Sequence, residues 1–195
     1  MDLDGPNLQN GLANIAQDLP NSLQAWRWAV EHDQPQLLEA ALPSIFLFFN
    51  TRSRFLEAVG LFESAYQRWQ NQPHNLALQA TLLAYLSVFY QRVGRRSEEM
   101  QSLETSLALC QKAQLDHLFG FVLERMAYAY HKKGSLKEAR QYAEQSRQWA
   151  EKNQDKRNLQ AVYVVLAAIA YDEGHLEEVN RSLHLSLDLA REIGN

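Results

Sequence analysis

A glycine recurs along this chain at a fixed interval of 40 residues, at Gly94, Gly134 and Gly174. Each glycine follows a segment of helical periodicity and precedes a second such segment whose first turn carries a glutamate. Glycine just past a helix end readily takes the left-handed conformation that terminates the helix. Acidic groups near the next N-terminus suit the helix dipole. Each unit is therefore predicted to be a helix, a tight turn and a second helix.

Small side chains recur at fixed offsets from these glycines. Seven residues before them stand Ser87, Ala127 and Ala167; twelve residues after them stand Ser106, Ser146 and Ser186; sixteen after them stand Cys110, Ala150 and Ala190. Small residues allow helices to approach closely while larger neighbours fill the gaps. An earlier unit fits the pattern with Ser53 in the place of the glycine, at a spacing of 41 from Gly94.

The pattern predicts an all-α chain without strands, because helical periodicity fills the intervals between turn signals. We expect a right-handed superhelical solenoid of about four helix-turn-helix repeats with a period near 40 residues. Residues 1–195 would form one domain, with lead-in helices over 1–34 and hairpins over 35–73, 74–114, 115–154 and 155–195. The expected helices cover 21–33, 36–51, 54–71, 75–92, 96–113, 117–132, 136–152, 156–172 and 176–193, with a further helix over 8–18.

Prolines occur only in the first part of the chain, where they constrain helix starts. Pro20 and Pro35 suit first-turn positions, where the missing N–H costs nothing. Pro43 predicts a kink within its helix or a later helix start.

Composition narrows the classes of function. Of the 195 residues, 46% are hydrophobic and 22% charged, which is typical of a folded globular protein. The net charge of −4 gives no general attraction to nucleic acid or to anionic membranes. A single cysteine, Cys110, excludes an intrachain disulfide and fits a cytoplasmic setting. Without an apolar run of about 18 residues, we expect no membrane span.

The repeat pattern resembles tetratricopeptide repeats, in the longer-period variety of bacterial signal-transduction ATPases and of LuxR-type or maltose-regulator-like transcription activators. The stretch "LPNSLQAWRWAVEHDQPQLLEAALPSIFLFFNTRSRFLEAVGLFESAY" resembles the segment that opens the helical sensor region of these regulators. The positions that match are Asn21, Leu23, Ala25, Trp28 and Ala29, and then Phe48, Phe49, Ser53, Arg54 and Phe55, with serine replacing a glycine. The closing "LSLDLAREIGN" resembles the junction between two such repeats.

The resemblance implies a sensor part whose nucleotide switch and DNA-binding parts belong to a longer parent chain. In agreement, the sequence has no phosphate-binding glycine loop and no helix-turn-helix DNA reader. An alternative is a free-standing scaffold that joins proteins. An alternative from another class is a metal-dependent enzyme, because His175 with Glu178 and His184 with Asp188 share helix faces. Metal sites need three or four ligands, so we expect no metal, no cofactor and no catalytic residue.

The inner face of such a solenoid predicts the binding surface for a protein, a peptide or a small effector. The candidates, by their offset from the glycines, are Gln91, Phe121, Glu124, Tyr128, His131, Val164 and Tyr171. Mixed aromatic and polar side chains are typical of recognition surfaces. The alternative is that these aromatic residues pack between helices. For Trp26, Trp28, Trp69 and Trp149, and for Cys110, we predict packing roles.

Two further surfaces are candidates for docking. Basic residues cluster at successive turns, namely Arg52, Arg54, Arg92, Arg95, Arg96, Lys132, Lys133 and Lys137. They would form an electrostatic edge for an acidic partner, or they simply complement helix C-termini. Direct binding of nucleic acid is not expected from the overall charge. The last helix offers Val179, Leu183, Leu187, Ala190 and Ile193, an apolar surface that predicts self-association or docking on further sequence.

Overall fold

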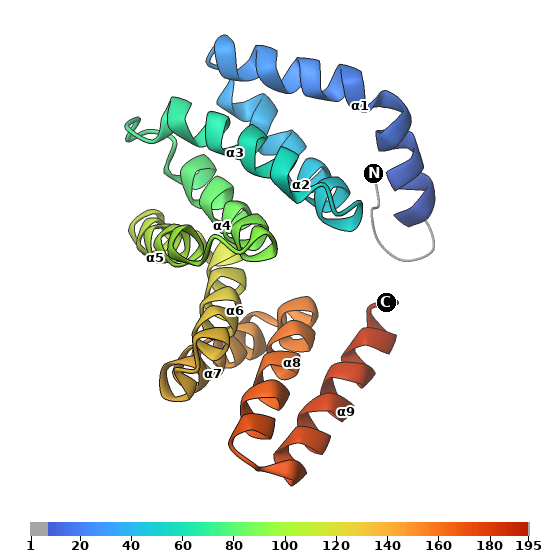
Figure 1. Ribbon diagram of the computed structural model, residues 1–195, viewed down its shortest axis with the longest axis vertical. Coiled ribbons are helices and arrows are strands. Elements are labelled where there is room, and N and C mark those ends of the chain that lie inside the picture. The colour runs from blue at the N-terminus through green and yellow to red at the C-terminus, as the bar shows by residue number, and fades with distance from the viewer. Residues whose placement is uncertain (1–7, 195) are drawn as a thin grey trace. The chain divides into compact units, whose positions relative to one another are not determined.

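The computed structural model describes residues 8–194, and this part of the chain contains nine α-helices and no strand (Figure 1). The helices are α1 (Leu8–Glu31), α2 (Pro35–Thr51), α3 (Phe55–Trp69), α4 (Leu76–Val93), α5 (Arg96–Ala113), α6 (Asp116–Lys133), α7 (Leu136–Asn153), α8 (Lys156–Asp172) and α9 (Leu176–Glu192). The all-α prediction is confirmed for the described residues. From α2 onward, the predicted helix ends lie within two residues of the observed ones.

The N-terminal helices depart from the prediction at their prolines. The expected helix start at Pro20 is wrong, because α1 continues through this residue from Leu8 to Glu31. An internal proline removes one backbone hydrogen bond and bends the helix, and Figure 1 shows α1 bent along its length. Helix α2 begins at Pro35 as predicted and continues through Pro43.

Glycine ends the first helix of each C-terminal pair in the predicted way. Gly94, Gly134 and Gly174 have φ angles of 79°, 82° and 80°. At each site the glycine N–H donates to the carbonyl three residues back, and the next N–H donates to the carbonyl five residues back. This pair of bonds satisfies carbonyl groups that the helix end would leave without a donor. Ser53 takes the same conformation, with φ 55°.

The intervening turns use glutamine in the same left-handed conformation. Gln114 and Gln154 have φ angles of 53° and 56°, so left-handed residues stand 20 positions apart from Gly94 to Gly194. The series is interrupted between α3 and α4. That connection contains Pro73 and has no left-handed residue, and it is closed by the Gln72 N–H to Trp69 and the Asn75 N–H to Gln72. The extra residue between Ser53 and Gly94 therefore lies in this turn.

The recurring serines join the two helices of each C-terminal pair. The Oγ atoms of Ser106, Ser146 and Ser186 donate to the carbonyls of Ala80, Gly120 and Gln160 at 2.8, 3.1 and 3.1 Å. In every pair the acceptor stands 26 residues before the serine. A small hydroxyl side chain thus allows the second helix to lie close to the first and satisfies its own buried oxygen.

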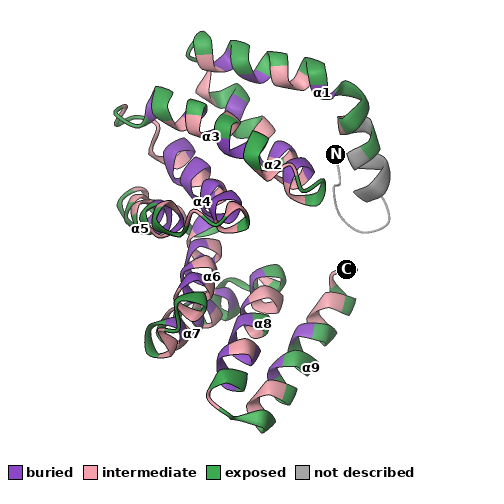
Figure 2. Cartoon of the chain, viewed as in Figure 1, coloured by how far each residue is buried: buried purple, intermediate pink, exposed green. Residues whose placement is uncertain are grey.

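The chain divides after Leu109 into two compact units. The first unit has an aromatic core, in which the Phe62 ring lies 5.2 Å from Trp26 and 5.3 Å from Phe89 between ring centroids. The second unit has a core of small and aliphatic side chains, including Ala127, Ala143, Val162 and Ile169. Figure 2 shows α4 mostly buried, whereas α9 buries only Ser182 and Ser186. The prediction of one domain over 1–195 stays a prediction.

Within residues 8–194, no helix combines the length and the apolar character that a membrane crossing requires.

Candidate binding surface on α6 and α8

Helices α6 and α8 contact each other in the second unit and carry most of the predicted binding residues. His131 in the last turn of α6 places its Nε2 2.8 Å from Oδ2 of Asp172, the final residue of α8. A carboxylate oxygen accepts hydrogen bonds, so Nε2 is the donor. The other ring nitrogen, Nδ1, is buried and has no partner among the described residues. This bond ties together the two helices that form the surface.

Tyr128 lies one turn before His131 and contacts two cations. The guanidinium carbon of Arg125 lies 5.1 Å from the centre of the Tyr128 ring, and Nζ of Lys132 lies 5.4 Å from it. Both distances fall within the range of cation–π attraction. The half-buried tyrosine is therefore held in one orientation, which lowers the entropy that it would lose on binding a partner.

Glu124 is the one predicted binding residue whose side chain is buried, with 3% exposure. Arg125 neutralises it: Nε donates to Oε2 at 2.6 Å, and Nη2 donates to Oε1. Burial of a carboxylate is costly unless the charge is paired. At this position the guanidinium of Arg125, which is 23% exposed, is more accessible than the acid.

The remaining predicted residues differ in exposure. Val164 and Tyr171 on α8 are 46% and 67% exposed, whereas Phe121 on α6 is half-buried. They stand seven residues apart on α8, so both lie on the same helix face. Gln91 belongs to α4 in the first unit, where its carbonyl accepts the N–H of Gly94. The structure therefore brings together the α6 and α8 candidates but not Gln91.

Acidic residues compensate part of the predicted basic edge. Arg54 donates to Glu57, and Arg95 donates to both Glu63 and Glu98. The same Glu63 accepts the Tyr90 hydroxyl at 2.8 Å, and burial raises the pKa of that tyrosine. Arg92, Lys132 and Lys133 lie over aromatic rings. Use of this edge for docking, including Arg52, Arg96 and Lys137, stays a prediction.

Among the described residues, Glu173, His175 and Glu178 bring potential metal-ligand atoms within 4.8 Å of one another. Arg140 of α7 occupies the two carboxylates. It donates to Glu173 through Nε and Nη2, and to Glu178 through Nη1 at 2.7 Å. These hydrogen bonds hold the pKa of Glu173 below its ordinary value. The arrangement is an ion-pair cluster that links α7 to the α8–α9 turn, and His184 lies outside it.

Sequence reasoning missed several of these contacts. Arg125, Arg140 and Asp172 carry no motif, and only packing of separate helices reveals their partners. The packing role predicted for Trp26, Trp69 and Cys110 is confirmed, since all three are buried. For Trp28 it is wrong, because the ring is 48% exposed and stacks on His32 at 4.5 Å. Trp149 is half-buried.

Comparison with solved structures supports the fold. The chain is similar to the crystal structure of BtubC (BKLC) from P. vanneervenii, with a TM-score of 0.71. The match has 16% sequence identity and covers 95% of this chain and 74% of that chain. At this identity, the likeness concerns the fold alone. No protein-family model matches the chain, and no curated protein matches it significantly.

Proposed function

We propose that this chain is an interaction module built as a right-handed superhelical solenoid of about four tetratricopeptide-like hairpins with a period near 40 residues. The 20-residue series of left-handed residues from Gly94 to Gly194 supports this architecture. The serine-to-carbonyl bonds of three successive pairs support it independently, because all three span 26 residues. Stacked hairpins of this kind generate extended surfaces for partners.

The observation that carries the function is an exposed apolar face on α8 and α9. Val164, Tyr171 and Leu183 are 46%, 67% and 47% exposed. The residues that stand 40 positions earlier are Glu124 and Ala143, which are buried, and His131, whose side chain is only 9% exposed. The face of α6 and α7 that is covered in the chain is thus repeated, with larger apolar residues, on α8 and α9. Exposed apolar patches of this kind mark sites of protein interaction.

A helix is the occupant that fits this face, because a helix covers the corresponding face of α6 and α7. Helix α8 packs on both α6 and α7. The available amphipathic helix of matching character is α9 of a second copy, whose Leu176, Leu183 and Leu187 are exposed. Two-fold pairing through one patch needs only self-complementarity. The proposed partner of this face is therefore another copy of the chain.

Substitution of Leu183 by glutamate tests this docking. We expect the light-scattering mass of the wild type to rise toward twice the monomer mass as protein concentration increases. Leu183→Glu should remain monomeric because docking would bury an unpaired charge. Leu56→Glu is the matched control, since Leu56 is 76% exposed on α3 in the first unit. A wild type that stays monomeric at the highest concentration, or a Leu56→Glu variant that is equally impaired, would contradict the proposal.

We further propose that the module is the sensor part of a larger cytoplasmic signal-transduction ATPase or transcription regulator. Binding of a protein, a peptide or a small effector near Tyr128 and Tyr171 would then favour one arrangement of the parent domains. A free-standing scaffold is the alternative. A phosphate-binding glycine loop encoded upstream in the same gene would distinguish the regulator from the scaffold.

The metal-dependent enzyme receives less support from the side-chain geometry. Arg140 already supplies positive charge to Glu173 and Glu178, so a cation would have to displace it. Elemental analysis of the purified chain is the discriminating measurement. Stoichiometric zinc held through His175 would favour the enzyme.

A further inference from the structure

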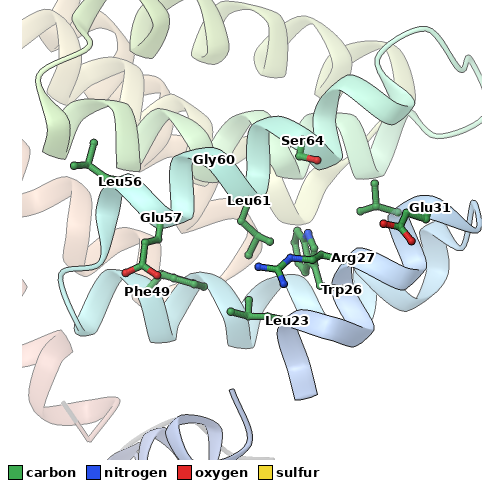
Figure 3. Close-up of a pocket in the computed structure, with 11 residues that line it drawn as sticks. Leu23, Trp26, Arg27, Glu31, Phe49, Leu56, Glu57, Gly60, Leu61 and Ser64 are labelled. Atoms are coloured by element: carbon green, nitrogen blue, oxygen red, sulfur yellow. The ribbon is translucent and has the colours of Figure 1, made fainter. Parts of the chain in front are cut away.

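A pocket of about 540 Å³ opens in the first unit between α1, α2 and α3 (Figure 3). Its wall includes Leu23, Trp26 and Arg27 of α1, Phe49 of α2, and Gly60 and Leu61 of α3. Small-molecule sites in proteins measure roughly 300–1,000 Å³, combining apolar walls with a few polar groups. This pocket has that size and that composition, and it contains none of the residues considered above as binding candidates.

The indole N–H of Trp26 is a buried donor without an acceptor. The residue is 3% exposed, and among the described residues nothing accepts its Nε1 hydrogen. Trp69, the other fully buried tryptophan of this unit, donates its Nε1 hydrogen to Oδ1 of Asp33 at 2.8 Å. Buried polar groups in native proteins are nearly always satisfied, and an exception needs an explanation. A ligand that brings an acceptor into this pocket would supply the missing partner.

Arg27 adds a positive charge at the same place. Its guanidinium has no ion-pair partner within residues 8–194, and in Figure 3 it points into the pocket between Leu23 and Leu61. Glu57 on the rim is already bound by Arg54, with Nε 2.7 Å from Oε1. Glu31 lies toward the other end of the pocket in Figure 3. An unpaired arginine beside an unpaired indole N–H forms a donor set suited to a carboxylate.

Gly60 leaves the pocket wall open. It lies in the interior of α3, where glycine weakens a helix relative to alanine. No packing contact requires the glycine, because a Cβ atom added there meets nothing within 4 Å. The structural consequence of this glycine is the open space in front of Phe49 and Leu61.

We propose that this pocket binds a small carboxylic acid with an apolar body. The apolar part lies against Leu23, Phe49 and Leu61. The carboxylate accepts the hydrogen of Trp26 Nε1 and pairs with the guanidinium of Arg27. This site is separate from the α6–α8 surface and does not depend on the function proposed for that surface.

The test is a titration of the ¹⁵N-labelled full chain with octanoate and with 3-phenylpropanoate, followed through the tryptophan indole N–H resonances. The Trp26 signal is assigned as the one that Trp26→Phe removes. We expect this signal to shift with saturation, whereas octylamine, which presents a cation, should leave it in place. Arg27→Gln should weaken binding at least tenfold, because the ion pair is lost.

Two variants at one position separate pocket filling from helix effects. Gly60→Leu occupies the pocket and should abolish binding, whereas Gly60→Ala strengthens the helix equally well and should retain it. The proposal is overturned if neither acid shifts the Trp26 signal, if Gly60→Leu binds as well as Gly60→Ala, or if octylamine binds like the acids. Should Gly60→Leu fail to fold, unchanged binding by Arg27→Gln overturns it.

Discussion

A Gly120→Ala variant is expected to lower the free energy of unfolding by about 3 kcal/mol, the upper part of the range for overpacked cores. Gly120 lies on α6, where a Cβ atom would stand 2.3 Å from Cε3 of Trp149 and 2.5 Å from Nδ2 of Asn158. These side chains belong to α7 and α8, so three helices meet at a position with no space for a methyl group. The Ser146 hydroxyl lies within hydrogen-bonding distance of the Gly120 carbonyl and of Asn158 Oδ1, and displacement of α6 would break this buried arrangement.

The matched control is Gly60→Ala, which makes the same chemical change in the interior of another helix. An added Cβ at Gly60 meets no atom within 4 Å, so this variant should gain about 1 kcal/mol from helix propensity. Urea unfolding followed by circular dichroism measures both variants. Combining Gly120→Ala with Trp149→Leu should cost less than the sum of the two single changes, because the clash is removed. Equal stabilities for the two alanine variants would contradict the three-helix contact.

An Arg140→Met variant is expected to lose about 2 kcal/mol at neutral pH, between the values for exposed and buried ion pairs. Arg140 is 28% exposed and bridges Glu173 and Glu178, which are 22% and 34% exposed. Methionine retains the apolar stem but leaves two carboxylates close together without a cation. Arg147→Met is the control, since Arg147 lies on the same helix, is 29% exposed, and pairs only with acids of its own helix. Its loss should stay below about 0.5 kcal/mol.

The cost of Arg140→Met should depend on pH in a defined direction. The hydrogen bonds from Arg140 lower the pKa of Glu173 in the folded state below the ordinary 4.5. The stabilisation is then complete above pH 4.5 and disappears as the pH falls through the lower folded-state value. Unfolding at a series of pH values should therefore show the two proteins converging in stability between pH 7 and pH 3. A difference that stays constant over this range would exclude Glu173 as the main partner.

Helix positions and turn positions were predictable because their signals are local. Gly94, Gly134 and Gly174 announce left-handed turns, and apolar periodicity places the helices between them. Ser53 could be placed by its register even though serine carries only a weak signal. Gln114 and Gln154 could not, since glutamine has no preference for the left-handed conformation and tertiary packing imposes it. At Pro20 the local rule favoured a helix start, but the packed helix α1 continues through the proline.

Candidate sites were less predictable because they depend on contacts between distant segments. The pairing of His131 with Asp172 spans 41 residues, and that of Arg140 with Glu178 spans 38. Glu124 was expected to be available to ligands, but the structure buries it beneath Arg125. The pocket at Trp26 joins residues of three helices, and the unsatisfied indole N–H that distinguishes it has no counterpart in sequence pattern.

Small-angle X-ray scattering of the monomer at low concentration tests the proposed solenoid most directly. A compact domain of 195 residues has a radius of gyration of roughly 16 Å. Hairpins stacked side by side form an elongated superhelix, so we expect a radius of gyration clearly above this value and an asymmetric distance distribution. A radius near 16 Å with a symmetric distribution would indicate a globular bundle and would contradict the stacked-hairpin account.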